Sequence, residues 1–431
     1  MLVNFHNKDR KEFYYLHTYP GYSKKHVKTY SIPNGNPSSI AHVGNFVDYV
    51  DIKNENIYYV EFLGTETFTH FKLEDYVDVP WLDKIRYQDI KLLLHMSGHG
   101  YHEIVENIYL NVVLRDKVPI DNIIISTESF DIEKAVNYVS KKYNVKPFRV
   151  RVTLEFELAA KIQAHTLINY LDGAYKEKVI IEPFKFENKK YEKKFLCLNG
   201  FYREHRAAIV FLLASKNLLD QGYISYNIKD SGWVSTGSNV YNDLINKLDT
   251  NEEAVTLLAK NKEKLCAINN ILLDTEYNDR SKSLAQILPE HNYWFNNSYF
   301  SVVTETNFPY MQSKNFNYDE NEFYDLVGRL YSEKIFRSII YKHPFLVTGP
   351  KHFLKQLRSF GYKTFHPFID ETYDEVDNHA TRLMMIVNET ERLCNLTEEE
   401  LIKFLEFSKK ICDYNFEVLK RRDKFVFDLP L

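Results

Sequence analysis

Ser332, Glu333 and Lys334 stand where a helix is predicted to begin, and together they could serve a phosphate-bearing ligand. Serine is a common N-cap, and apolar residues follow at helical spacing: Ile335, Phe336, Ile339 and Ile340. A nucleoside diphosphate needs free backbone N–H groups, a cation for its phosphates and a carboxylate for its ribose hydroxyls. The alternative, which residue types alone favour, is that Glu333 pairs with Arg337 while Lys334 is solvated.

A second run, FLCLNGFYREHRAA, places two arginines shortly after a predicted strand. Residues 195–199 form this apolar strand, and Arg203 and Arg206 fall at the start of the helix that follows. Arginine binds phosphate through two hydrogen bonds. Side chains after a parallel strand lie at the edge of the sheet where ligands bind. The alternative is a surface arginine paired with Glu204.

The elements that would position these residues alternate between strand and helix. Residues 1–80 are predicted to be β-rich and irregular, with strands at 12–19 and 56–63. From residue 89 onward, apolar strands alternate with amphipathic helices, which predicts parallel βαβ units. The charged segment 187–194 is the predicted linker. We therefore expect an acceptor-side domain over residues 1–190 and a ligand-binding domain over 191–431.

Several elements are predicted in detail. Asp131 is the expected N-cap of a helix over 131–143, and a single helix is expected over 251–273. A last short strand is expected at 362–365, before two long helices at 373–394 and 398–422 that brace the domains, the last returning to the first domain. The predicted fold class is α/β, with two Rossmann-like domains facing a cleft. The chain lacks G-x-G-x-x-G and P-loop motifs, which disfavours a dinucleotide dehydrogenase or a P-loop NTPase.

Together these runs resemble the donor-binding half of two-domain (GT-B) glycosyltransferases, those of phages and giant viruses and, more distantly, the α1,3-fucosyltransferases. The T-E-K motif of the fucosyltransferases corresponds to Ser332-Glu333-Lys334, with a serine where the family usually has threonine. The viral relatives share patterns like Thr304-Glu305-Thr306 before this motif and the segment 370–374 (DETYD) after it. The resemblance covers roughly residues 195–395.

The resemblance implies roles for five residues in binding a nucleotide sugar, UDP- or GDP-linked, that acts as a co-substrate with no further cofactor. Glu333 would bind the donor ribose and Lys334 the pyrophosphate. Arg206, or second to it Arg203, would also contact the pyrophosphate, and Glu305 would line the sugar side.

An inverting transfer also needs one general base near the acceptor hydroxyl. The glycine-bearing turn after residue 97 is the place to look, and Glu103 and His102 are the candidates. His95, His99 and His102 do not have the spacing of a known metal site. With no clear D-x-D motif, we expect a metal-independent enzyme.

The composition and the cysteine spacing bear on the cellular compartment of the protein. The chain of 431 residues has a net charge of −4, and its four cysteines are widely spaced and read as free thiols of a reducing compartment. No transmembrane stretch or signal peptide is predicted, so we expect a cytoplasmic protein without membrane contact, in the host cytoplasm if viral. The acceptor would be a glycan or, for a viral enzyme, a hydroxymethylated base of phage DNA.

DNA phosphates could bind at two basic segments. One is the lysine-rich segment 184–194, which has interleaved aromatic residues, and the other is the tail 420–424. The alternative for segment 184–194 is a solvated linker. Two other functions remain open. One is a non-catalytic viral assembly or binding protein on the same fold. The other is a different α/β nucleotide-dependent transferase, with Mg²⁺ held by Asp370, Glu371 and Asp374, although these residues read more simply as an acidic helix start.

Overall fold

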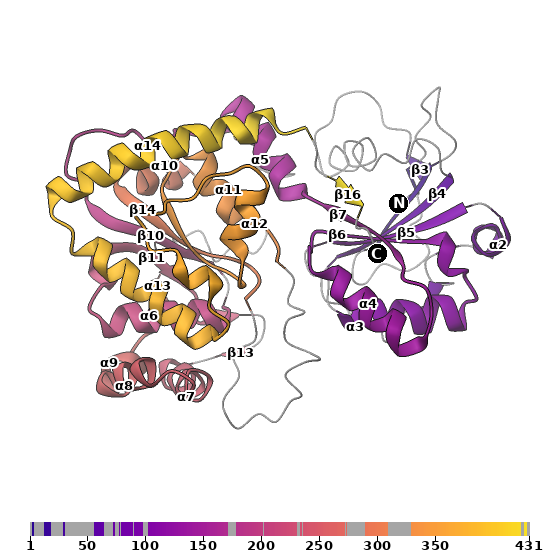
Figure 1. Cartoon of the computed structure of the whole chain (residues 1–431), viewed down its shortest axis with the longest axis horizontal. Coiled ribbons are helices and arrows are strands. Elements are labelled where there is room, and N and C mark those ends of the chain that lie inside the picture. The colour runs from indigo at the N-terminus through magenta and orange to yellow at the C-terminus, as the bar shows by residue number, and fades with distance from the viewer. Residues whose placement is uncertain are drawn as a thin grey trace. The chain divides into compact units, whose positions relative to one another are not determined.

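The chain is a mixed α/β protein with two parallel or largely parallel sheets (Figure 1). The computed structural model describes residues 2–3, 13–18, 29–30, 56–63, 72–73, 77, 79–88, 90–97, 102–170, 178–200, 202–230, 233–234, 236–271, 273, 289–308, 329–423 and 426–428. Among these residues, no helix has the length and apolar character needed to cross a membrane.

The chain divides into two compact units, and it passes between them more than once. The first unit comprises residues 1–155, 325–330 and 423–431, and the second comprises residues 156–324 and 331–422. This division differs from the boundary expected at residue 190. The charged segment 187–194 is part of the second unit because Tyr191 is buried against Tyr299, with ring centroids 4.8 Å apart. Lys193 and Lys194 already belong to the strand that follows.

The first unit contains a six-stranded sheet in the order β16-β7-β6-β5-β4-β2. Its strands are β2 (Phe13–Thr18), β4 (Asn56–Leu63), β5 (Ile90–Ser97), β6 (Ile123–Thr127), β7 (Arg149–Thr153) and β16 (Val426–Asp428). Neighbouring strands are parallel except that β16 runs antiparallel to β7. The C-terminal segment therefore joins the first unit as a strand, and not as the helix expected. A separate parallel pair joins β1 (Leu2–Val3) to β3 (Thr29–Tyr30).

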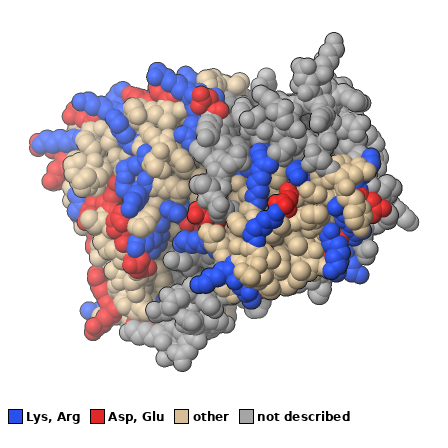
Figure 2. All heavy atoms as spheres, turned by 45° about the vertical axis from the view of Figure 1, so that its right-hand side comes forward, with Lys and Arg blue, Asp and Glu red and all other residues tan. Residues whose placement is uncertain are grey.

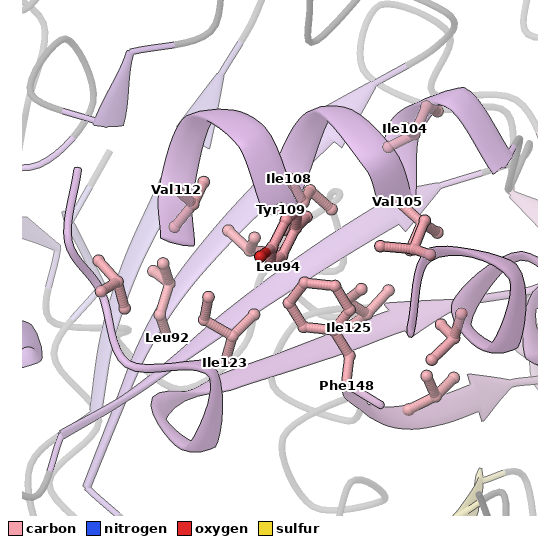
Figure 3. Packing of buried hydrophobic residues seen from close by; sticks show 14 of the residues in the cluster. Leu92, Leu94, Ile104, Val105, Ile108, Tyr109, Val112, Ile123, Ile125 and Phe148 are labelled. Carbon is pink, nitrogen blue, oxygen red and sulfur yellow. The ribbon is translucent and has the colours of Figure 1, made fainter. Parts of the chain in front are cut away.

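Helices cover this sheet through an apolar core (Figure 3). They are α2 (Val79–Tyr87), α3 (His102–Ile108), a π-helix (Tyr109–Arg115), a 3₁₀ turn (Ile120–Asn122) and α4 (Ile132–Tyr143). Alternate strand residues point toward them: Leu92 pairs with Ile123 in register, and Leu94 pairs with Ile125. Ile104, Val105 and Ile108 of α3 pack onto these side chains. The intervening Leu93 and Ile124 are also fully buried, as expected for a parallel sheet that is covered on both faces.

The second unit is built on a four-stranded, fully parallel sheet in the order β11-β10-β14-β15. The strands are β10 (Lys193–Asn199), β11 (Gly222–Tyr226), β14 (Ser298–Thr304) and β15 (Phe345–Thr348). In chain order this is 2-1-3-4, so the direction of winding reverses between β10 and β14. Right-handed crossovers then place helices on opposite faces. Figure 1 shows α6 (Glu204–Ser215) and α13 (His379–Cys394) on one face, and α10 (Pro289–Asn296), α11 (Glu333–Ile340) and α14 (Glu398–Arg421) on the other.

The second unit also contains the helices α5 (Glu155–Thr166), α7 (Gly237–Lys247), α8 (Glu252–Lys260), α9 (Lys262–Cys266) and α12 (Phe353–Ser359), and a 3₁₀ turn (Leu219–Gln221). Two antiparallel strand pairs complete the described elements outside the sheet: β8 (Ile168–Tyr170) with β9 (Lys178–Ile180), and β12 (Lys229–Asp230) with β13 (Trp233–Val234). The single helix expected over 251–273 is interrupted at Asn261, whose amide side chain donates to the carbonyl of Leu257 at 2.9 Å.

The strand expected at 362–365 is wrong. The acidic segment 370–374 begins only a short 3₁₀ turn, and the long helix expected from residue 373 begins at His379. Residues 362–365 are irregular, because the backbone N–H of Phe365 donates to the buried carboxylate of Glu371 and not to a neighbouring strand. Asp374 lies in a short 3₁₀ turn (Thr372–Glu375) and accepts hydrogen bonds from the backbone N–H groups of Leu354 and Lys355, each at 2.9 Å. The acidic segment therefore stabilises the first turn of α12 from outside the helix.

We expect Asp374→Ala to lower the free energy of unfolding of the second unit by about 1–3 kcal/mol, because two buried amides at the start of α12 lose their acceptor. The matched control is Asp377→Ala, which removes a carboxylate that is 88% exposed and paired with Lys351. That change should cost less than about 0.5 kcal/mol. Urea titration of both variants measures the difference, and equal losses would contradict the capping role.

Candidate functional site

Polar side chains gather where the central strands of the second unit end. The hydroxyl of Thr304, the last residue of β14, donates to the amide oxygen of Asn199, the last residue of β10, at 2.6 Å. The backbone N–H of Asn199 in turn donates to the hydroxyl of Ser225 on β11 at 2.9 Å. In open parallel sheets, ligands bind beyond the carboxyl ends of the strands at the point where the winding reverses. That point in the second unit lies between β10 and β14.

Glu305 follows β14 directly and is fully buried. One carboxylate oxygen, Oε2, accepts hydrogen bonds from the hydroxyl of Ser332 and from the backbone N–H of Thr306, the latter at 3.0 Å. The other oxygen, Oε1, has no hydrogen-bond partner among the residues that the structure describes. Burial raises the pKa of Glu305, while the charge of Lys334 and the hydrogen bond from Ser332 act in the opposite direction.

Lys334 brings a cation to this carboxylate from the first turn of α11. Its ammonium Nζ lies 2.6 Å from Oε1 of Glu333, 2.9 Å from the hydroxyl of Thr306 and 3.4 Å from the hydroxyl of Ser332. These acceptors match the three protons of a lysine ammonium, and the contact with Ser332 is the longest. Burial lowers the pKa of Lys334 and the charge of Arg206 adds to this effect, whereas Glu333 and Glu305 oppose it.

Ser332 is the N-cap of α11, as predicted, and its hydroxyl accepts the backbone N–H of Lys334 at 3.3 Å. The other amides of a helix's first turn have no partner inside the helix and carry a partial positive charge. Burial alone would raise the pKa of Glu333, but the ammonium of Lys334 and the charge of Arg337 bring that pKa below its ordinary value. Glu333 therefore stays ionised beside the positive end of the helix.

The start of α6 supplies a second cation and a histidine. Arg206 is buried, and its Nη2 donates to the backbone carbonyl of Glu305 at 3.3 Å. Nε2 of His205 lies 2.9 Å from the same carbonyl, so this nitrogen carries the proton. The ring of His205 stacks on Phe308 with centroids 5.1 Å apart. Burial and the charge of Arg206 hold the pKa of His205 well below its ordinary range, so the ring is neutral at pH 7.

The structure brings together four of the five residues singled out for donor binding: Arg206, Glu305, Glu333 and Lys334. Arg203 is instead the exposed N-cap residue of α6 and contributes a charge near His205. Glu333 and Glu204 have partners other than the arginines considered as alternatives from sequence. The hydrogen bond of Glu333 goes to Lys334, and Glu204 pairs with Lys247.

The residues proposed as the general base belong to the first unit. His102 and Glu103 begin α3, but their side chains lie outside the described residues, as do residues 98–101, which include His99. Their role stays a prediction. The nearby Glu106 accepts hydrogen bonds from Lys142 and Tyr143. Within the described part of the chain, no group of histidine, cysteine, aspartate and glutamate side chains could hold a metal ion.

The lysine-rich segment is not arranged to stack nucleic-acid bases. Two of its three aromatic side chains, Phe184 and Tyr191, are buried, and only Phe186 is partly exposed. Phe184 packs edge-to-face on His343 with centroids 5.0 Å apart. Lys189 pairs with Glu187, and Lys190 pairs with Glu398. Figure 2 shows basic and acidic side chains interspersed over the face in view.

The sequence patterns predict no role for His205 or Thr306, and they do not predict the hydrogen bond from Ser332 to Glu305. His205 directly precedes Arg206, and Thr306 is the last residue of the Thr304-Glu305-Thr306 pattern, so their positions beside predicted site residues could have indicated a role. Searches with protein-family models and against curated proteins and solved structures found no match for this chain.

Glu305→Gln should change how stability depends on pH. A carboxyl whose pKa is raised by burial favours the folded state at low pH, and this contribution is lost as the pH rises through the folded-state pKa. Glutamine does not titrate, so the melting temperature of the variant relative to wild type should rise between pH 4 and about pH 8.

Thermal unfolding of both proteins across this pH range measures that difference. A difference that stays constant with pH would contradict a raised pKa at Glu305.

Proposed function

We propose that this protein is a glycosyltransferase that transfers a sugar from a nucleotide-sugar donor to a hydroxyl acceptor. One observation carries the proposal: Arg206, Lys334 and the first turn of α11 meet around the buried Glu305 where the winding of the parallel sheet reverses. Arg206 binds the backbone carbonyl of Glu305, whereas Ser332 and the charge of Lys334 act on its carboxylate. The proposal includes the GT-B architecture, in which two Rossmann-like domains face a cleft and the second unit binds the donor.

In the proposed complex, the donor diphosphate binds to the two cations and to the free amides of α11. A phosphate oxygen would replace Ser332 at Nζ of Lys334, because the 3.4 Å contact is the weakest of the three. Glu333 would accept hydrogen bonds from ribose hydroxyls. Oε1 of Glu305 would accept one from a sugar hydroxyl, which gives this buried atom a partner.

The transfer then needs little chemistry from the second unit beyond positioning and charge stabilisation. The acceptor oxygen forms a bond to the anomeric carbon as the bond from that carbon to the diphosphate breaks. Arg206 and Lys334 stabilise the negative charge that develops on the leaving diphosphate. The acceptor proton passes to a general base of the first unit, for which Glu103 and His102 remain the candidates. We propose a metal-independent reaction in the cytoplasm, with a hydroxymethylated DNA base or a glycan as acceptor.

A thermal-shift panel tests the donor assignment. The pure protein is heated with UDP, GDP, CMP, ADP, dTDP and the corresponding nucleotide sugars, with and without Mg²⁺. The proposal expects a rise of several degrees with one diphosphate in the absence of metal. A rise that strictly requires Mg²⁺ would favour another nucleotide-dependent transferase, and no rise with any compound would favour a binding or assembly protein.

Lys334→Ala and Arg206→Ala should each weaken binding of that diphosphate by about 30-fold or more, because each removes a charge-assisted hydrogen bond. Lys342→Ala is the matched control. Lys342 follows α11, is 26% exposed against 21% for Lys334, and pairs with Asp413 at 2.9 Å. Calorimetric titration measures the three affinities, and unchanged binding in both site variants would overturn the assignment.

A further inference from the structure

An ion pair in the first unit holds the chain just before it enters the site. Asp131 is 7% exposed and lies between β6 and α4. Its Oδ2 accepts hydrogen bonds from the backbone N–H of Arg329 at 2.7 Å and from Nε at 3.0 Å, and its Oδ1 accepts one from Nη2 at 2.7 Å. The backbone N–H of Phe130 donates to the carbonyl of Arg329 at 3.2 Å. Arg329 is therefore held through its main chain and its side chain.

The carboxylate of Asp131 binds Arg329 where it could have capped α4. The sequence predicts Asp131 as the N-cap of α4, and it occupies that position, but its side chain makes no capping hydrogen bond. Its carboxylate binds Arg329 instead. Aspartate at an N-cap normally accepts an amide of the first turn. A residue that departs from a strong local preference in this way is a candidate for a functional constraint.

The chain that leaves this anchor leads directly into the site. Residues 325–330 belong to the first unit, and the second unit resumes at Tyr331. Only Leu330 and Tyr331 separate Arg329 from Ser332, and both are buried. The hydroxyl of Tyr331 donates to the carbonyl of Phe353 at 2.9 Å. The segment from Arg329 to Ser332 therefore begins at the ion pair with Asp131 and ends at the cap of α11.

We propose that Asp131 and Arg329 are positioning residues for the anion site at α11. Breaking the pair releases the segment that sets the first turn of α11, and so weakens ligand binding although neither residue belongs to the group that binds the diphosphate. The inference rests on the proposed function, since the ligand is the donor diphosphate. In this view, donor binding by the second unit depends on an ion pair within the first unit.

The test compares Asp131→Asn with Asp116→Asn in the full-length chain. Asp116 is a close match: it is 8% exposed, accepts the backbone N–H of Leu73 at 3.0 Å, and binds Nε and Nη2 of Arg115 at 2.8 and 3.0 Å. Both changes remove the charge of a buried aspartate that is paired with a partly exposed arginine of the first unit. Only Asp131 is joined to the segment that enters the site.

Two readouts are used with each variant. The first is the calorimetric Kd for UDP and GDP, which Asp131→Asn should raise by about five- to tenfold and Asp116→Asn should leave unchanged. The second is hydrogen exchange at residues 331–336, which should be faster in Asp131→Asn than in Asp116→Asn without any ligand. Arg329→Lys keeps the charge but loses the bidentate geometry, so it should fall between wild type and Asp131→Asn.

The outcomes separate the two proposals. If the wild type binds neither compound and no member of the wider panel, the proposed function fails, and the exchange rates still decide whether the pair positions α11. If the wild type binds but Asp131→Asn binds equally well, or if both aspartate variants lose the same affinity, the positioning role is overturned while the proposed function stands.

Discussion

Burial of Glu305 is the constraint on which the rest of the site depends. Its backbone N–H donates to Thr348 of β15, its carbonyl accepts from Arg206 of α6, and its carboxylate accepts from Ser332 at the cap of α11. One residue therefore joins two strands and two helices at the carboxyl edge of the sheet. A buried carboxylate is costly unless it is hydrogen-bonded or paired. Here the cost is partly offset by hydrogen bonds on one oxygen and by a nearby ammonium, while the other oxygen has no partner among the described residues.

The parallel sheet makes this arrangement possible. Because the winding reverses between β10 and β14, the helices that follow these strands pack on opposite faces of the sheet. The starts of α6 and α11 are then brought to the same edge, and Arg206 and Lys334 lie near one another although they are far apart in sequence. Burial lowers the pKa of Lys334, and the charge of Arg206 adds to this effect against the opposing charges of Glu333 and Glu305. A ligand that carries negative charge would relieve the repulsion between Lys334 and Arg206, and that is the physical basis for assigning a diphosphate to the site.

Much of this could be predicted from sequence because the signals are local. The apolar run at 298–304 gives β14, and Ser332 before an amphipathic stretch gives the start of α11. The features that sequence did not predict depend on distant partners. Asp131 occupies the predicted cap position, but its carboxylate binds Arg329, far along the chain, and makes no capping hydrogen bond. Asp374 resembles a helix start, but it caps α12, which precedes it in the chain. Tyr191 lies in a charged run that resembles a linker, yet it is buried against Tyr299. The hydrogen bond of Ser332 to Glu305 joins residues 27 positions apart, beyond the reach of any local pattern.

The most direct test of the account is a crystal structure of the protein grown with UDP or GDP, whichever gives the larger thermal shift. If the donor site is as proposed, the two phosphates lie between the guanidinium of Arg206, the ammonium of Lys334 and the first-turn amides of α11, and the contact between Lys334 and Ser332 is broken. Phosphates bound elsewhere, with Lys334 still bonded to Ser332, would contradict the proposed site.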